Sequence, residues 1–395
     1  IMSRLEQLIN ELCPNGVEYV NIGSIVNYEQ PTNYIVTSTD YNDNFDIPVL
    51  TAGQSFILGY TNEIENIYNA SIESPVIIFD DFTAAFKWVD FPFKVKSSAM
   101  KMLTSNIEKT TLRYIFHMMS SICYSTDEHK RLWISRYSQL QIPLPPLPVQ
   151  EEIVRILDNF TELTAELTAE LTAELTARKK QYDYYRDELL TFKDGEAEWK
   201  TLGDLCKIGD GLHGTPKYDD NGEYYFINGN NLDNGKITFK TKTNKVDNTI
   251  FYKHGNDFSV EKTIFMSING TIGSVSFYNN EKIVLGKSVA YFNIESSELY
   301  SRYLYYFLKT DYSSNYFEAQ KTGSTIKNLG LKALRGFKIP IPPLKEQERI
   351  VAILDKFDIL VNDISSGLPA EIAMRNKQYE YYRELLLGFD KADRS

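Results

Sequence analysis

The chain has 395 residues, of which 43% are hydrophobic and 24% are charged, and its formal net charge is −11. A chain of this length is longer than one hydrophobic core usually organises, so we expect at least two globular domains. No run of about 18 apolar residues and no apolar targeting segment is present, and the three cysteines lie too far apart for a disulfide framework or a metal-binding spacing; we therefore expect a cytoplasmic protein without a membrane span.

Residues 2–12 are expected to form a short helix, because the segment RLEQLINEL resembles the ends of two helices predicted further along the chain. The first insert follows, from about Glu18 to Leu140, and is expected to be α/β with many short strands. The apolar run Ser74–Phe79 predicts a buried strand, and Thr111–Ser121 predicts a helix. The carboxylates of Asp80–Asp81 have no companion Glu-x-Lys, so they indicate a structural or capping role rather than a nuclease site.

The segments 142–192 and 339–389 repeat one another, with 27 identities in 51 positions, a constant offset of 197 residues and no gap. Prolines cluster at the start of each segment, where a helix cannot yet have begun, and apolar residues then recur at spacings of three and four. Each copy therefore predicts a long helix with one apolar face, and the other copy is its obvious partner. Because unlike sequence separates the copies, we infer a duplicated frame that carries two different inserts.

The first copy contains three perfect Thr-Ala-Glu-Leu tetrads at Thr164–Leu175. Ala, Glu and Leu favour helix, so we expect an uninterrupted helix over Gln150–Leu190, about 60 Å long at about 1.5 Å per residue. Each tetrad adds about 6 Å and turns the next leucine by about 40°, because four residues slightly exceed one turn. A spacer of adjustable length and a plain low-complexity helix both fit this pattern.

The second insert runs from about Glu198 to Phe337, and its first eight residues match those of the first insert at an offset of 180. Thr263–Ile268 predicts a buried strand, and Leu299–Lys309 predicts a helix. A Gly-x-Gly-x-x-Gly match begins at Gly209, but no strong strand precedes it and Thr215-Pro216 prevents a helix after it. We interpret the match as a turn rather than a nucleotide-binding loop.

The second copy of the frame is expected to break near Ser365–Leu368, because Gly367 and Pro369 can end one helix and begin another. The predicted fold is therefore mixed α/β (α+β), with two globular domains joined by two long helices packed as an antiparallel coiled coil. The halves are expected to be related by a pseudo-two-fold axis, and the frame is circular because the N-terminus supplies a piece that each repeat carries at its C-terminal end. The predicted segments are the first domain 1–141 with its helical piece 2–12, the spacer 142–192, the second domain 193–338 and the helical region 339–395.

Sequence motifs of catalysis are missing. The chain has no Gly-x-x-x-x-Gly-Lys-Ser/Thr phosphate loop, no zinc-binding spacing of its four histidines and no Asn/Asp-Pro-Pro-aromatic signature of amino-methyltransferases, so we interpret it as non-catalytic. Basic residues nevertheless cluster inside the acidic molecule, at 82–113 in the first insert and at 234–246 and 319–338 in the second. Such clusters favour nucleic-acid contact at confined patches, and solvated surface lysines are an equal alternative.

Three features together resemble the specificity subunits of type I restriction-modification enzymes: the repeated Pro-Pro-Leu and Ile-Leu-Asp segments, the Lys-Gln-Tyr…Tyr-Tyr-Arg ends and the tetrads. The resemblance covers essentially the whole length, and the tetrads match a subset of that family. In the first insert, the segments Pro48–Gly53, Val76–Phe82 and Lys94–Met100 also resemble a known type of recognition domain.

The resemblance implies two target-recognition domains, each reading one half of an asymmetric, bipartite site in double-stranded DNA. It implies that the frame binds two methyltransferase subunits, which methylate adenine N6, and that restriction subunits join this core. S-adenosylmethionine, ATP and Mg²⁺ then belong to the partner subunits, and this chain needs no cofactor of its own. The alternatives are a protein–protein scaffold that never touches DNA and a stand-alone bipartite DNA-binding regulator.

In such a protein, Lys and Arg hold DNA phosphates and a few polar side chains read base edges. In the first insert we predict a base reader at Gln54 and further DNA contacts at Lys87, Lys94, Lys96, Ser97, Ser98, Lys101 and Arg136. In the second insert we predict DNA contacts at His213, Lys217, Asn230, Asn231, Lys287, Lys321, Thr325 and Lys327. On the frame, the predicted spacer and partner interface comprises Leu163, Leu167, Leu171, Leu175, Tyr182, Tyr185, Tyr379 and Tyr382. Packing between the helices explains the tyrosines equally well.

Overall fold

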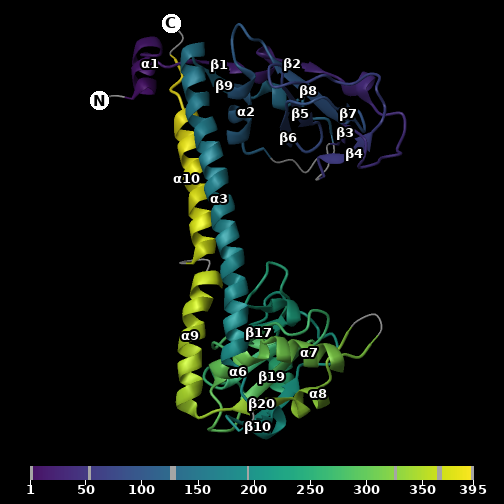
Figure 1. Cartoon of the computed structure of the whole chain (residues 1–395), viewed down its shortest axis with the longest axis vertical. Coiled ribbons are helices and arrows are strands. Elements are labelled where there is room, and N and C mark those ends of the chain that lie inside the picture. Colours follow the sequence, from purple (N-terminus) through teal and green to yellow (C-terminus); the bar gives the residue numbers. More distant parts are fainter. Residues whose placement is uncertain are drawn as a thin grey trace. The chain divides into compact units, whose positions relative to one another are not determined.

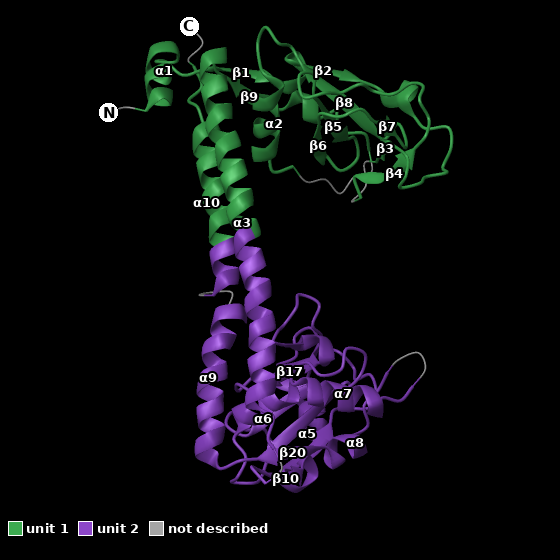
Figure 2. Cartoon of the chain, viewed as in Figure 1, with its two compact units in different colours: residues 1–169, 373–395 green, residues 170–372 purple. Residues whose placement is uncertain are grey.

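The computed structural model of the chain describes residues 3–51, 55–124, 130–193, 195–323, 327–362 and 367–392. The chain divides into two compact units, one that combines 1–169 with 373–395 and one that comprises 170–372 (Figure 2). Each unit contains one insert and part of the helical frame, so the compact units divide the chain differently from the four segments of the repeat. None of the helices within the described ranges is long and apolar enough to cross a membrane.

The insert of the first unit contains a four-stranded sheet with the strand order β2-β8-β5-β6 and a three-stranded sheet with the order β4-β3-β7 (Figure 1). The inner strand β5 spans Val76–Asp80, and all five of its residues are buried, as its continuous apolar run predicts. The remaining elements are β2 (Val26–Glu29), β3 (Ile47–Leu50), β4 (Ile57–Thr61), β6 (Phe86–Val89), β7 (Lys94–Val95), β8 (Met100–Ser105) and the helix α2 (Leu112–Ser121).

The insert of the second unit contains a four-stranded sheet with the order β11-β19-β16-β17 and a three-stranded sheet with the order β15-β12-β18. The inner strand β16 spans Thr263–Ser267 and is fully buried. The other strands are β11 (Cys206–Asp210), β12 (Tyr224–Ile227), β13 (Leu232–Asp233), β14 (Lys236–Ile237), β15 (Lys245–Val246), β17 (Val275–Phe277), β18 (Ile283–Leu285) and β19 (Val289–Ile294). The helices are α4 (Leu202–Leu205), α5 (Asn248–His254), α6 (Ser301–Leu308), α7 (Asp311–Gln320) and α8 (Leu331–Gly336).

The two inserts share one topology although their sequences are unlike. In the first, β3 pairs antiparallel with β4 and parallel with β7; in the second, β12 pairs antiparallel with β15 and parallel with β18. A two-stranded antiparallel ribbon joins the start of each insert to its end: β1 (Glu18–Asn21) pairs with β9 (Gln141–Leu144), and β10 (Glu198–Thr201) pairs with β20 (Lys338–Ile341). Each ribbon brings together the two ends of its insert.

The frame consists of three helices, of which α3 is a single helix of 43 residues from Leu147 to Leu189. The second copy is divided, as predicted, into α9 (Leu344–Asn362) and α10 (Leu368–Leu387). Gly367 lies between them, whereas Ser365 and Ser366 lie outside the described residues. The boundary between the compact units, after Ala169, falls within the tetrads of α3.

The frame helices pack antiparallel within each unit, through the same pair of side chains. In the first unit the Phe160 ring of α3 stacks on the Tyr382 ring of α10, with centroids 5.7 Å apart and an interplanar angle of 24°. In the second unit the Tyr185 ring of α3 stacks on the Phe357 ring of α9, at 5.9 Å and 27°. Phe357 and Tyr382 are the repeat equivalents of Phe160 and Tyr185, so the duplicated sequence makes the same contact twice.

The circular organisation is visible in the first unit, where both chain ends meet. The N-terminal helix α1 (Arg4–Leu12) begins with a capping box between Ser3 and Glu6, and its Leu5 joins the same apolar core as Leu387 near the end of α10. The Val17 N–H donates to the Asp390 carbonyl at 2.9 Å, and the Ala392 N–H donates to the Val17 carbonyl at 3.0 Å. The N-terminal segment therefore completes a frame that the C-terminal segment begins.

Candidate nucleic-acid interface

In the second insert, loops at one edge of the sheets line a cleft of about 700 Å³. β11 and β16 run antiparallel to β19, and β18 leads directly into β19. The ends of β11, β16 and β18 therefore lie beside the start of β19. Asp210, Asn228, Asn269 and Ser288 lie at these strand ends and face the cleft. Loops carried on a rigid scaffold of strands are where binding residues are most often found.

Side chains of the cleft hold the loop after β12 in place. Ser288 Oγ donates to Asn228 Oδ1 at 3.0 Å and accepts from the Gly229 N–H at 3.0 Å. Asn231 Oδ1 accepts from the Asn228 N–H at 3.0 Å, and its Nδ2 donates to the Thr238 carbonyl at 2.9 Å. These hydrogen bonds fix the shape of the loop.

The first insert connects its loops by the same backbone hydrogen bonds. Its Asp81 N–H donates to the Ala99 carbonyl at 3.0 Å, as the Ile268 N–H donates to the Ser288 carbonyl at 2.9 Å in the second insert. The loop from β7 to β8, which contains Ser97 and Ser98, is therefore equivalent to the loop from β18 to β19, which contains Lys287. The two inserts present different side chains from equivalent loops.

Most of the predicted DNA-contacting side chains are at least partly accessible. The exposed ones are Lys87, Arg136, His213, Lys217, Asn230, Lys287 and Lys327, and the half-buried ones are Lys96, Ser97, Ser98 and Lys321. The cleft brings His213 and Lys287 together, and Lys327 precedes Asn328 of its lining. Gln54 and Thr325 lie outside the described residues.

The structure corrects the predicted DNA contact of Lys94, because this side chain is buried and paired within the first insert. The residue is 2% exposed; its Nζ donates to the Glu65 carbonyl at 2.7 Å and lies 2.9 Å from Glu63 Oε2. Burial alone would raise the pKa of the Glu63 carboxyl, but hydrogen bonds from the Ser38 N–H, the Lys94 ammonium and the Thr37 N–H and hydroxyl outweigh it and lower that pKa to about 2. The ammonium is therefore not available to a phosphate.

The predicted DNA contacts of Lys101 and Asn231 are corrected for similar reasons. Lys101 and Asp81 are each 1% exposed, and Lys101 Nζ lies 2.9 Å from Asp81 Oδ2. Asp81 Oδ1 also accepts from the N–H groups of Leu132 and Trp133, at 3.1 and 2.8 Å, which confirms the structural role expected of this aspartate. Asn231 is buried, and its amide forms the loop hydrogen bonds described above.

Each insert is fixed to the frame by one buried glutamine. Gln150 Nε2 donates to the carbonyls of Pro145 and Lys109, and its Oε1 accepts from Thr110 Oγ1 at 2.8 Å. Its repeat equivalent Gln347 donates to the carbonyls of Pro342 and Glu298 and accepts from the Tyr300 N–H at 2.9 Å. Both side chains are fully buried, so the two inserts are attached in one manner.

Replacing Gln150 by leucine is expected to lower the free energy of unfolding of the first unit by at least about 2 kcal/mol, because several buried polar groups lose their partner at once. Amide hydrogen exchange near Thr110 and Pro145 should rise, whereas exchange around Gln347 should stay as in the wild type. Gln139→Leu, at an exposed position of the same unit, serves as the control. A stability loss no larger than in that control would contradict the role of Gln150.

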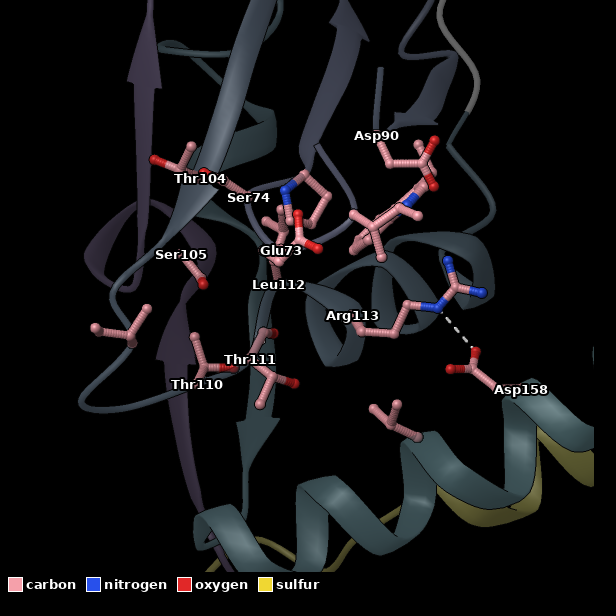
Figure 3. A pocket seen from close by; sticks show the side chains of 15 residues that line it. Glu73, Ser74, Asp90, Thr104, Ser105, Thr110, Thr111, Leu112, Arg113 and Asp158 are labelled. Atoms are coloured by element: carbon pink, nitrogen blue, oxygen red, sulfur yellow. Dashed lines mark hydrogen bonds and ion pairs between the residues drawn. The ribbon is translucent and has the colours of Figure 1, made fainter. Parts of the chain in front are cut away.

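A second repeated contact joins the insert helices to the frame. Arg113 Nε of α2 donates to Asp158 Oδ1 of α3 at 2.8 Å (Figure 3), and Arg302 Nη2 of α6 donates to Asp355 Oδ1 of α9 at 2.7 Å. The Arg113 guanidinium lies 4.8 Å from the Trp88 ring centroid, and Arg302 lies 5.5 Å from that of its topological equivalent in the second insert, Phe277.

These contacts border a surface groove in each unit. The groove of the first unit, shown in Figure 3, has a volume of about 880 Å³, and the corresponding groove of the second unit has about 690 Å³. The same insert–frame junction is therefore built twice.

The predicted frame interface is only partly exposed. Tyr182 is buried in the core of the second unit, which corrects its assignment to a partner surface, and Tyr185, Tyr379 and Tyr382 contact other frame side chains. The equivalent rings Tyr184 and Tyr381 face solvent more fully, at 63% and 62% exposed, whereas Tyr185 and Tyr382 are each 38% exposed.

The tetrad leucines do not form one uniformly buried face. Leu163 is 60% exposed and Leu171 is buried, whereas Leu167 and Leu175 are half-buried. The reason is the turn of about 40° that separates successive leucines spaced by four residues. Leu171 and Leu175 therefore fit packing, and Leu163 stays accessible to a partner.

Several polar residues of the cleft were not predicted from the sequence. Asn269 could be read only as part of an Asn-Gly turn, and Ser288 and Asn328 had no motif. Their proximity follows from the strand pairing of the second insert, which a single sequence does not reveal.

Comparison with known proteins identifies the fold and the family. A solved structure titled as the basis of complex assembly and conformational transition of the type I R-M system matches with a TM-score of 0.63 and 18% identity, over 95% of this chain and 98% of that chain. This likeness concerns the fold alone.

Sequence relatives are closer. The specificity subunit of the type I restriction enzymes EcoR124I and EcoR124II of Escherichia coli is 44% identical over 417 aligned positions, covering 99% of this chain and 98% of that protein. A Haemophilus influenzae protein named as a type I restriction enzyme specificity subunit is 34% identical over 85% of this chain and 86% of its own length. The family model described as the type I restriction modification DNA specificity domain matches residues 14–177 and 195–374. The chain therefore belongs to the type I restriction-modification DNA specificity family.

Proposed function

We propose that the chain reads a bipartite, asymmetric site in double-stranded DNA, with each insert binding one half-site. The observation that carries this proposal is that two inserts of one topology present different side chains from equivalent loops, on a frame that repeats its own contacts. Two similar folds with unlike loops suit two short sequences that differ. The frame then sets the unread spacer between them.

The accessible basic side chains suit contact with phosphates. Lys87 and Arg136 serve the first insert, and Lys217, Lys287 and Lys327 serve the second. Charge confined to such patches reconciles DNA binding with a net charge of −11, because association responds to the local field as well as to the sum. Accessible polar side chains, among them Ser97, Ser98 and Asn230, are left to read base edges.

The frame is proposed to hold two methyltransferase subunits, one against each unit. Two features support this stoichiometry: the insert–frame junction is built twice, and Tyr184 and Tyr381 expose equivalent aromatic rings, a residue type enriched at protein interfaces. Restriction subunits would join through this core. The complex is proposed to act in the cytoplasm, where chromosomal and incoming DNA are accessible.

Catalysis is assigned to the partners. Specificity subunits recognise the target, whereas methyl transfer and cleavage, with S-adenosylmethionine, ATP and Mg²⁺, are proposed to belong to the methyltransferase and restriction subunits. The chain itself then needs no cofactor.

Lys287→Ala is expected to weaken DNA binding on all sequences alike and to reduce the slope of log affinity against log salt by about 1, because one phosphate contact is lost. Titrations of the purified chain with its methyltransferase partner, at several salt concentrations, measure this. Lys282→Ala is the matched control: Lys282 and Lys287 flank opposite ends of β18, and Lys282 Nζ lies 3.4 Å from Glu223. An unchanged slope in Lys287→Ala would contradict the phosphate contact.

The same titrations decide between the proposal and its rivals. A pure scaffold would bind the methyltransferase but add no salt-dependent DNA affinity. A stand-alone regulator would bind its DNA site equally well without any partner. The proposal predicts sequence-specific binding that strengthens when the methyltransferase is present.

A further inference from the structure

The cleft of the second insert contains one polar atom that the described fold leaves unsatisfied. Asn269 Oδ1 is shielded from solvent, and within the described part of the chain no donor forms a hydrogen bond with it. The Asn228 amide of the same cleft differs, since its Oδ1 accepts a hydrogen bond from Ser288 Oγ. A buried acceptor without a partner is unfavourable and uncommon. The Asn269 side chain as a whole is half-buried and lines the cleft, so a rotation of its amide toward a ligand that brings a donor would be favoured here.

The backbone around Asn269 is held firmly on one side and open on the other. Asn269 forms an antiparallel bridge with Asn328, and the Leu329 N–H donates to the Ile268 carbonyl at 2.9 Å. Gly270 follows with φ +71°, and a side chain built there would meet nothing within 4 Å. The main chain beside the Asn269 amide is therefore accessible to a bulky, planar ligand.

The surroundings of Asn269 suit one nucleotide of a duplex. Lys287 provides an exposed cation in the cleft, Asn328 provides a second amide, and Leu331 provides half-buried apolar surface. A phosphate, a base edge and a base methyl group or face match these three kinds of group. An acceptor at the amide position selects a base that presents an amino donor, which in the major groove means adenine N6 or cytosine N4.

We propose that Asn269 reads one base of the half-site bound by the second insert, with its Oδ1 accepting a hydrogen bond from the exocyclic amino group of adenine or cytosine. The inference rests on the proposed DNA-binding function and goes beyond it by assigning a base-reading residue. Lys287 holds the phosphate backbone beside that base and carries no sequence information.

The test uses the full chain expressed with its methyltransferase subunit, and the readout is the adenine-methylated motif found across a host genome. Asn269→Leu removes both hydrogen-bonding groups while keeping a side chain that branches at the γ position, and Asn269→Asp keeps the acceptor while removing the amide donor. Asn221→Leu, on an exposed loop outside the cleft, is the control. The wild type is expected to require adenine or cytosine at one position of the second half-site, on the strand that faces Asn269.

In Asn269→Leu, discrimination at that single position is expected to fall about tenfold or more, which is the worth of a good base contact. The first half-site and the remaining bases should stay unchanged. Asn269→Asp should retain the requirement for an amino-bearing base, and Asn269→Ala, which also removes the amide, takes the place of the leucine variant should that variant fail to assemble. An unchanged motif in both variants, or a uniform loss at every position, overturns the inference while leaving the proposed function intact. A wild-type chain that directs no sequence-specific methylation overturns the proposed function itself, and the inference with it.

Discussion

Replacing Lys101 by methionine is expected to destabilise the first unit by about 3–5 kcal/mol, because the change leaves the buried Asp81 carboxylate without its counter-charge. Both side chains are 1% exposed, and their charged atoms lie 2.9 Å apart. Denaturant unfolding followed by hydrogen exchange in β5 and β8 measures the loss for this unit. Lys87→Met, at an exposed position on β6 of the same sheet, should change stability by well under 1 kcal/mol.

The double variant Lys101→Met with Asp81→Asn sharpens this test. A neutral amide removes the unpaired charge and keeps an oxygen that can accept from the N–H groups of Leu132 and Trp133. Much of the lost stability should therefore return. The second insert supports this reasoning, since apolar residues, Ile268 and Ala290, occupy the equivalent positions there. Equal losses in the single and double variants would show that packing, not charge, makes Lys101 important.

Deleting the tetrad Thr172–Leu175 is expected to change the unread spacer of the DNA site while leaving both half-sites intact. The deletion shortens α3 by about 6 Å and rotates its ends relative to each other by about 40°, whereas neither insert loses a residue. We expect the spacer to change by about one or two base pairs, given about 3.4 Å per base pair. The methylated motif of the deletion variant gives the result directly.

A matched control separates length from composition. Glu166→Ala with Glu170→Ala alters two tetrads but keeps the length and the helix propensity of α3, so its motif should equal that of the wild type. If the deletion variant also keeps the wild-type spacer, α3 is not the element that sets it, and the tetrads are only a low-complexity helix.

The helical frame could be predicted closely because its sequence occurs twice in the chain. The identities between its copies located α3, α9 and α10 and the break around Gly367, and the short echo between Glu18 and Glu198 located the start of each insert. Helical periodicity and proline position act locally, so one sequence carries them. The common topology of the inserts could not be predicted, since almost no sequence similarity accompanies it beyond the first strands.

The candidate contacts were predicted less well, for a physical reason. Lys94 and Lys101 look like phosphate ligands in a basic stretch, but their strands β7 and β8 place them inside, where Glu63 and Asp81 pair with them. Those acidic partners lie 20 or more residues away along the chain and are brought close only by the fold. Lys287 and His213, on loops at the strand ends, stay accessible because no strand partner covers them.

Two inserts of one fold are proposed to read two different half-sites at a distance set by the frame. A genome-wide map of adenine methylation, in a host that expresses this chain with its methyltransferase subunit, tests this proposal. We expect one motif with two specific half-sites of different sequence, separated by an unread spacer of fixed length. A continuous motif, a motif recognised by one insert alone, or methylation without sequence preference would contradict it.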